Sequence, residues 1–314
     1  MRCAGSSALT ERHTAPQTGA LIVLVLGACA IGFSPILVRL TTTGPAAAGF
    51  WRLALALPIL AFGPALFGTG PDGASPWRPT PTILLAGLFF ALDLGFWHYG
   101  VTFTTVADAT ILANLSPVFV TLGAWLILRE RPGRRFVAAL GLALVGTLII
   151  ASAGHAGAAR DRILGDVFSV ATAVWYAAYM LTVRAARGKT TASQVMLWSS
   201  LAGAPLMLVA ALALGETVVP TSAAGWLACA GLGLVHVTGQ GAIAWALGRL
   251  PAAVASVIVL AQPVVSAILG WLIFGEAMVA LQIAGAAVAL TGVVLAQLAA
   301  TRAPVVQRPS HVTL

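Results

Sequence analysis

Residues 114–130, NLSPVFVTLGAWLILRE, decide the fold because residues 260–276, LAQPVVSAILGWLIFGE, repeat them. The two segments stand 146 residues apart and share a proline, a tryptophan and a final glutamate. The correspondence continues outside them, since Gly146 matches Gly292 at the same offset. A nearly constant offset over such a long stretch indicates that the chain contains two copies of one unit.

The composition excludes a soluble globular protein. Hydrophobic residues make up 59% of the 314 residues, charged residues only 8%, and the mean hydropathy is +0.96. A soluble domain carries about 25% charged residues, which cover the surface that faces water. The same values argue against a disordered chain, and three cysteines are too few for a disulfide scaffold. We therefore expect an all-α membrane protein.

Runs without charge predict ten membrane helices of about 20 residues each. They are expected near residues 20–40, 45–67, 82–103, 106–128, 134–152, 163–184, 191–215, 224–247, 253–274 and 279–300. The predicted organisation is a cytoplasmic tail at 1–19, a first repeat at 20–152, a linker at 153–162, a second repeat at 163–300 and a cytoplasmic tail at 301–314. Little chain remains for a soluble domain, so function has to reside in the helices or at their ends.

The charges predict how the repeats are oriented. Five helices are an odd number, so the second repeat must cross the membrane upside down. With both termini in the cytoplasm, thirteen basic residues lie inside and only Arg39, Arg160 and Arg162 lie outside. Basic residues favour cytoplasmic connections, where they face anionic lipid, so the net charge of +8 does not indicate nucleic acid binding.

Two inverted repeats favour a transporter, because they can exchange conformations around a site at the membrane midplane. A structural membrane protein built by duplication and an enzyme buried in the membrane are the alternatives. The sequence has no phosphate-binding loop, metal-ligand cluster or nucleophile elbow, so no enzyme activity, cofactor or metal is predicted. Transport would then draw on ion or substrate gradients.

The repeats resemble the drug/metabolite transporter superfamily, and in particular its EamA-type members. The resemblance rests on the Trp-Leu-Ile-Leu/Phe-x-Glu ending of the fourth helix of each repeat. The family's Gly-Glu pair is intact at Gly275-Glu276 but reads Arg129-Glu130 in the first repeat, and its Trp-Gly pair reads Ile31-Gly32. The resemblance implies a secondary transporter that exports amino acids or related small metabolites. It also places helices three, four, eight and nine near the cavity, and helices five and ten at the periphery.

Asp93 is the sharpest candidate for the transport site, because it interrupts the apolar third span halfway along. A charge at the bilayer centre costs about 2.5–3.5 kcal/mol on insertion scales, so Asp93 should face the bundle interior. It would bind a proton or a substrate amine, or form a structural ion pair with Arg52. Trp97 shares its helix face. His98 lies about 140° around the helix and is a second titratable candidate.

Prolines mark corresponding places in the fourth and ninth helices. Asn114 and Ser116 precede Pro117, and Gln262 precedes Pro263. Proline removes an N–H group and leaves carbonyls that side chains, water or substrate must satisfy. Paired disruptions at the midplane predict a binding site there, with a packing kink as the alternative reading.

Four further residues are candidates for the cavity wall. His236 and Gln240 are four residues apart and should share a helix face, where they would line the cavity or bond neighbouring helices. Trp175 and Tyr176 would stack on a substrate, gate the pore or pack in the bundle.

Glu130 and Glu276, which end the fourth and ninth helices, are expected to be structural or gating residues or solvated helix ends.

These inferences define the predicted function. We expect a secondary-active exporter of small metabolites, with proton coupling an open possibility, which alternates access around a midplane cavity in a bacterial cell membrane. An uncoupled facilitator is the main alternative, and a non-transporting scaffold or intramembrane enzyme is the other. The expected partners are a small-molecule substrate, protons and the lipid bilayer, and a homodimer is left open. The arginines at positions 131, 134 and 135 are expected to form an anchor that faces cytoplasmic lipid.

Overall fold

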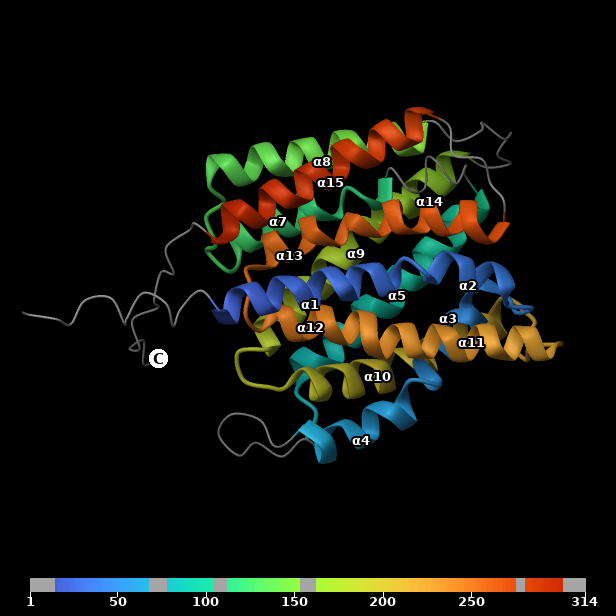
Figure 1. The fold of residues 1–314 in the computed structure, drawn as a ribbon. Coiled ribbons are helices and arrows are strands. Elements are labelled where there is room, and N and C mark those ends of the chain that lie inside the picture. Colours follow the sequence, from blue (N-terminus) through green and yellow to red (C-terminus); the bar gives the residue numbers. More distant parts are fainter. Residues whose placement is uncertain (1–14, 68–77, 104–111, 153–161, 275–279, 302–314) are drawn as a thin grey trace, which may run out of the picture.

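The structure is a computed structural model that describes residues 15–67, 78–103, 112–152, 162–274 and 280–301. All regular secondary structure in these residues is helical, and the helices run side by side along one bundle (Figure 1). In chain order they are α1 (Ala15–Ile31), α2 (Ser34–Leu40), α3 (Pro45–Ala54), α4 (Leu57–Phe67), α5 (Pro81–Phe103), α7 (Ser116–Leu126), α8 (Arg134–Ser152), α9 (Arg162–Ala186), α10 (Ala192–Ala213), α11 (Ala223–Val235), the π-helix η2 (His236–Gln240), α12 (Gly241–Leu247), α13 (Ala252–Val259), α14 (Ala261–Phe274) and α15 (Ala280–Thr301).

Seven helical segments in the described residues are long and apolar enough to cross a membrane. They correspond to the predicted spans one, two, three, six, seven, eight and nine. The other three predicted spans contain α7, α8 and α15. Large apolar side chains cover the outside of the bundle, and Ile163, Leu227 and Ile127 are 82%, 74% and 72% exposed. Such a surface suits lipid rather than water, which fits a multi-pass membrane protein.

Several of the predicted spans are broken near a proline. α2, α4 and α7 each begin one residue before Pro35, Pro58 and Pro117 respectively. α14 begins two residues before Pro263. The first turn of a helix has no internal acceptor for its N–H groups, so a residue without an N–H fits there. Because proline has no N–H to donate to the carbonyl four residues earlier, the hydrogen bonding of the preceding segment is interrupted there.

The two repeats meet at a reciprocal crossing of α8 and α15. A Cβ atom on Gly146 would collide with the backbone of Ala289, and one on Gly292 would collide with the backbone of Ala143. Each residue has its counterpart 146 positions away, so either helix contacts the other through the same surface, as across a two-fold axis. The residue numbers also run in opposite directions along the contact, so the two helices are antiparallel. This is the arrangement that inverted repeats require.

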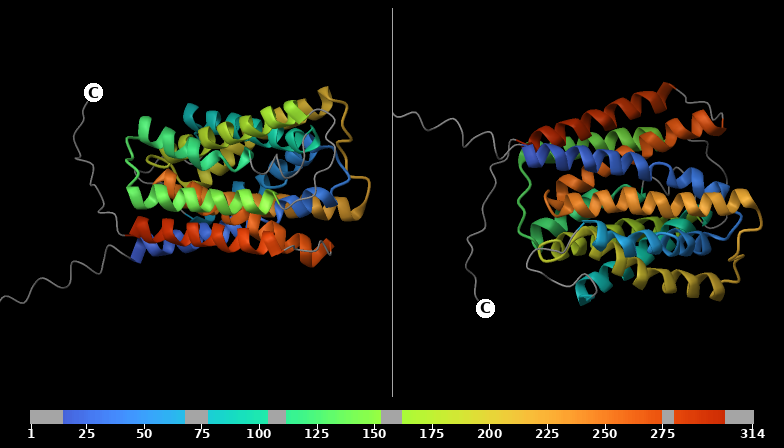
Figure 2. Two further views of the ribbon diagram at one scale, coloured as in Figure 1. Left: turned by 90° about the horizontal axis from the view of Figure 1, so that it is seen from above. Right: turned by 60° about the horizontal axis from the view of Figure 1, so that its bottom comes forward.

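Figures 1 and 2 show α8 and α15 side by side along one edge of the bundle. α1 begins and α15 ends at the same end of the molecule. The connections α7–α8, α9–α10 and α12–α13 lie at this end, which we call the basic end. Its basic residues are Arg129, Arg131, Arg134, Arg135, Arg184, Arg187, Lys189 and Arg249. The connections α2–α3 and α10–α11 lie at the opposite end, which we call the Glu216 end.

Candidate transport site

Two buried charges from different helices lie near each other inside the bundle. Arg52 on α3 is 4% exposed and Asp93, midway along α5, is 8% exposed. Their charges interact, but within the described residues they form no ion pair of 4.0 Å or less, and Arg52 Nε has no hydrogen-bond partner. The guanidinium carbon of Arg52 lies 5.6 Å from the ring centre of Phe90. A guanidinium and a carboxylate held in this way can receive the opposite charges of a ligand.

The other two candidates on α5, Trp97 and His98, have neighbouring rings. His98 is buried, and its ring centre is 5.0 Å from that of the half-buried Trp97. The His98 ring points toward α3, since a Cβ atom on Gly49 would lie 3.8 Å from His98 Cε1. The charge of Arg52 also acts on His98. The structure therefore groups His98 with the Arg52–Asp93 pair, although His98 and Asp93 occupy different faces of α5.

The second repeat contributes a histidine from an unusual helical segment. His236 is 1% exposed, and its Nε2 lies 2.9 Å from Ser200 Oγ on α10. The ring centre of His236 is 5.3 Å from that of Phe90, while its Nδ1 has no hydrogen-bond partner. His236 and Gln240 are both buried, but they span a π-helix rather than the expected α-helix. Single π-turns of this kind are frequent at functional sites.

Aromatic residues of α9 pack against α5, the helix that carries Asp93. Trp175 stacks on Phe89, with ring centres 5.9 Å apart, and its indole Nε1 has no hydrogen-bond partner. Tyr176 lies 6.1 Å from Tyr179 between ring centres, and Tyr179 lies 4.7 Å from Phe90. Both tyrosines interact electrostatically with Arg52 and Asp93. Tyr179, like Ser200, was not among the residues that the sequence predicted, although its spacing of three from Tyr176 places it on a neighbouring face.

The proline-linked candidates form separate groups in the described residues. Asn114 stands in the turn before α7, and Ser116 and Pro117 are buried in its first turn. Gln262 is half-buried on α14, and its Nε2 has no hydrogen-bond partner. Pro263 follows it. No hydrogen bond or ring contact among the described side chains links these five residues to the Arg52–Asp93 pair.

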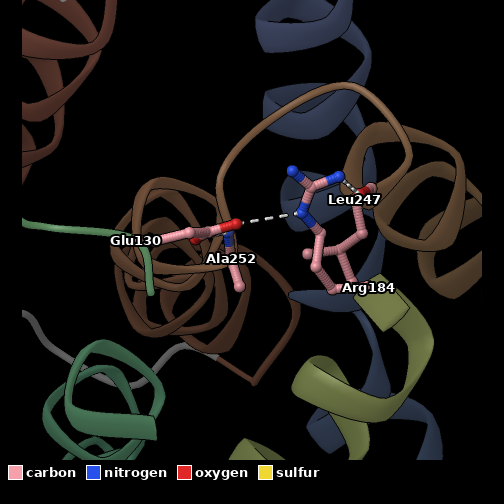
Figure 3. Close-up of polar contacts among 4 residues, drawn as sticks. All are labelled: Glu130, Arg184, Leu247 and Ala252. Carbon is pink, nitrogen blue, oxygen red and sulfur yellow. Dashed lines mark hydrogen bonds and ion pairs between the residues drawn. The ribbon is translucent and has the colours of Figure 1, made fainter. Parts of the chain in front are cut away.

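At the basic end of the bundle, Glu130 takes part in a polar contact that joins the α7–α8 connection to α9, α12 and α13 (Figure 3). Its Oε1 accepts a hydrogen bond from Arg184 Nε at 3.2 Å, and its Oε2 accepts one from the backbone N–H of Ala252 at 3.1 Å. Arg184 Nη1 in turn donates to the carbonyl of Leu247 at 3.0 Å. Because Ala252 is the first residue of α13, a carboxylate here stabilises the positive end of that helix. We call this group the Glu130 lock.

The outcome differs for the two glutamates. Glu130 is not simply a solvated helix end, since it is hydrogen-bonded to Arg184 on α9 and to the first residue of α13, and Arg184 is a partner that the sequence did not predict. Glu276 lies outside the described residues. Beside the lock, Arg187 Nε donates to the carbonyl of Ala244 at 2.9 Å. Partial burial and the neighbouring charge of Arg249 lower the pKa of Arg187 to about 10, so Arg187 stays charged at neutral pH.

At the opposite end of the bundle, Glu216 likewise binds the backbone N–H groups at the start of a helix. Its two carboxylate oxygens accept hydrogen bonds from the backbone N–H groups of Ala46 and Ala47, at 3.1 and 2.9 Å, in the first turn of α3. The hydroxyl of Tyr99 donates to the same carboxylate. Trp51 Nε1 also donates to the carbonyl of Val218, at 2.8 Å. The sequence did not predict this contact, because nothing local indicates that Glu216 reaches a helix 170 residues away.

An apolar bundle whose described secondary structure is all helical, with buried charges in its interior and polar contacts at both ends, defines a multi-pass membrane protein suited to transport. Residues 18–152 and residues 163–298 each match the EamA-like transporter family, and the chain belongs to that family. It is therefore a membrane transporter for small molecules rather than an enzyme.

Known relatives agree with this class. A pseudopaline exporter of Pseudomonas aeruginosa is 28% identical over 210 residues, which cover 65% of this chain and 70% of the relative. A riboflavin transporter of Vibrio cholerae is 28% identical over 194 residues, which cover 61% of this chain and 63% of the relative. A solved crystal structure that is 22% identical covers 92% of this chain and 98% of its own, with a TM-score of 0.75, and shows that the fold is shared.

Proposed function

We propose that the chain is a secondary-active exporter of small metabolites that carry a carboxylate and an amine, such as amino acids or related compounds. The observation that carries this proposal is the pair Arg52 and Asp93, which are buried and close but form no direct ion pair. The guanidinium suits a substrate carboxylate, with which it forms paired hydrogen bonds. Asp93 suits a substrate amine or a proton.

The unsatisfied polar atoms around this pair support a ligand. Arg52 Nε, Trp175 Nε1 and His236 Nδ1 are buried without a hydrogen-bond partner on three different segments. A buried polar group without a partner costs about 1–3 kcal/mol. A polar substrate or water held among these groups would satisfy them. The rings of Phe90, Tyr176 and Tyr179 would contact the apolar part of the same molecule.

The two ends of the bundle suit alternating access. The Glu130 lock joins α9, α13 and the α7–α8 connection, and Glu216 joins the α10–α11 connection to α3 and α5. In the proposed cycle, release of the Glu130 lock admits substrate from the cytoplasm and release of the Glu216 contact discharges it outside. This requires ten membrane helices in two inverted repeats with cytoplasmic termini. The concentration of basic residues at the end where α1 begins supports that orientation.

The test compares metabolites in the medium of cells that contain the wild type, Asp93→Asn, Arg52→Lys or an empty vector, at equal protein abundance in the membrane. We expect a metabolite with a carboxylate and an amine to accumulate outside only with the wild type. Arg52→Lys keeps the charge but loses the planar pair of donors, so accumulation should fall without vanishing. If all four cultures release the same metabolites, the proposed export function is wrong.

Coupling is tested separately with purified protein in vesicles loaded with the metabolite so identified. A pH gradient should accelerate transport by the wild type, and Asp93→Asn should transport at a rate that does not respond to the gradient. Equal transport by the wild type and Asp93→Asn with no response to the gradient in either would favour an uncoupled facilitator. In that case Asp93 has a structural role beside Arg52.

A further inference from the structure

A pocket at the basic end lies away from the transport site. It has a volume of about 370 Å³ and is lined by Trp125 at the end of α7 and by Arg131 and Pro132 in the α7–α8 connection. Trp125 is 51% exposed. The residues that follow it, Leu126 and Ile127, are 65% and 72% exposed. The pocket therefore joins a basic connection to an apolar surface that faces lipid.

The charges around this pocket are not balanced by the protein. Four arginines, 129, 131, 134 and 135, stand within seven residues, and in the described part of the chain none of them forms an ion pair. The acid in this stretch, Glu130, is already bonded to Arg184 and Ala252. Arg134 and Arg135 also occupy the first turn of α8, which has no acidic residue. The N-terminal end of a helix is positive, so arginines there are unfavourable without an anion.

The backbone of Arg129 gives a second, independent indication. Its φ angle is 56°, in the left-handed region that favours glycine. The corresponding residue of the second repeat, 146 positions on, is Gly275. The first repeat thus keeps an arginine where glycine would relieve strain, and such strain concentrates at sites with a function. Arg129, which bears this strain, adds a fourth positive charge beside the pocket.

We propose that the pocket of Trp125, Arg131 and Pro132 binds the anionic headgroup of a phospholipid. The phosphate accepts hydrogen bonds from the Arg131 guanidinium, and the neighbouring arginines supply a positive field. The indole of Trp125 lies at headgroup level, where tryptophan is favoured in membrane proteins. The acyl chains run along the exposed end of α7. Charge complementarity and the adjoining lipid surface identify the occupant as a lipid rather than a free anion.

The second repeat supplies a matched control. Trp271 corresponds to Trp125 and is 50% exposed, but the segment that follows it, Leu272 to Val279, contains no basic residue. Trp271 stands in the last turn of α14, and α14 ends at the opposite end of the bundle (Figure 1). Lys189 is a second control, since it is exposed at the basic end but does not line the pocket.

The test uses the purified full-length protein in a neutral detergent and native mass spectrometry with dioleoyl phosphatidylglycerol or phosphatidylcholine. We expect the anionic lipid to bind and the zwitterionic lipid to dissociate. Arg131→Gln should weaken the binding of phosphatidylglycerol about fivefold, which corresponds to the contribution of about 1 kcal/mol per basic residue at a membrane surface. Trp125→Ala should weaken this binding as well, whereas Trp271→Ala and Lys189→Gln should not.

The proposal is overturned by equal binding of the two lipids, or by equal losses in Arg131→Gln and Lys189→Gln. Glycerol 3-phosphate, which carries the phosphate without acyl chains, tests the source of the anion. If it displaces phosphatidylglycerol at equal concentration, the site binds a free phosphate and not a lipid. Circular dichroism checks that each variant is folded. High salt should weaken phosphatidylglycerol binding more in the wild type than in Arg131→Gln, because the arginine's contribution is screened.

Discussion

Replacing Glu130 by glutamine should open the basic end of the bundle without unfolding it. The amide oxygen of glutamine can still accept a hydrogen bond from Arg184 or Ala252, so what is lost is the charge. A hydrogen bond to a charged group contributes about 1.5–3 kcal/mol, against about 0.5–1.5 kcal/mol for a neutral one. Two such bonds would lose about 2 kcal/mol.

Solvent reduces this value. The side chains of Arg184 and Glu130 are 27% and 19% exposed, so water screens part of the attraction. We therefore expect a loss of about 1–2 kcal/mol, which raises the population of the open basic end about 5- to 30-fold.

Amide hydrogen exchange measures this opening directly, because the N–H of Ala252 is one of the donors in the Glu130 lock. In detergent or nanodiscs, the peptide that covers residues 250–256 should exchange about 5- to 30-fold faster in Glu130→Gln. Glu216→Gln is the matched control, and it should accelerate exchange near Ala46 and Ala47 instead. Unchanged exchange at 250–256, or equal acceleration at both ends in either variant, would refute this role for the Glu130 lock.

Three further predictions concern stability, each measured as thermal unfolding in detergent. Arg129→Gly should stabilise the protein by about 1 kcal/mol, because glycine adopts a φ of 56° without strain, and Arg129→Ala, which keeps the strain, should not. Gly146→Ala should destabilise by about 1–3 kcal/mol, because its Cβ would collide with backbone of α15, whereas Gly141→Ala has open space and should not destabilise. Ser200→Ala should destabilise by about 1–3 kcal/mol by leaving Nε2 of His236 without its partner, and unchanged unfolding would mean that water replaces the hydroxyl.

The fold was largely predictable because its determinants are local or repeat themselves. Low charge and long apolar runs indicated a helical membrane protein, and the match of Gly146 to Gly292 indicated two copies. The structure places both glycines at one crossing, with backbone in the space where side chains would be. The family is confirmed, while the domain boundaries and the count of ten spans stay predictions. Pro205 shows that a proline does not always predict a break, because it stands inside an unbroken α10. Pro58, which precedes it by 147 positions and so holds the corresponding place in the first repeat, follows a break between α3 and α4.

The candidate site was predictable only in part. Asp93 stood out because a single charge in an apolar span is conspicuous, and Arg52 could be proposed as its neighbour. Ser200 and Tyr179 could not be identified, because small hydroxyl and aromatic residues in a membrane helix carry no signal of what they contact. The π-helix at His236 was also missed, since four-residue spacing reads as an α-helix unless the local geometry is known.

The glutamates that cap α13 and α3 from distant parts of the chain have a consequence for how the molecule can move. When such a contact separates, both of its partners can be hydrated, because the carboxylate and the freed N–H groups bind water. The two ends of the bundle can therefore unfasten without exposing unsatisfied polar groups to hydrocarbon. The interior has no such freedom, since Arg52 and Asp93 are buried, with 4% and 8% of their surface exposed. Motion should thus begin at the two ends of the bundle. Whole helices would then move as rigid bodies around the buried centre, which keeps its packing.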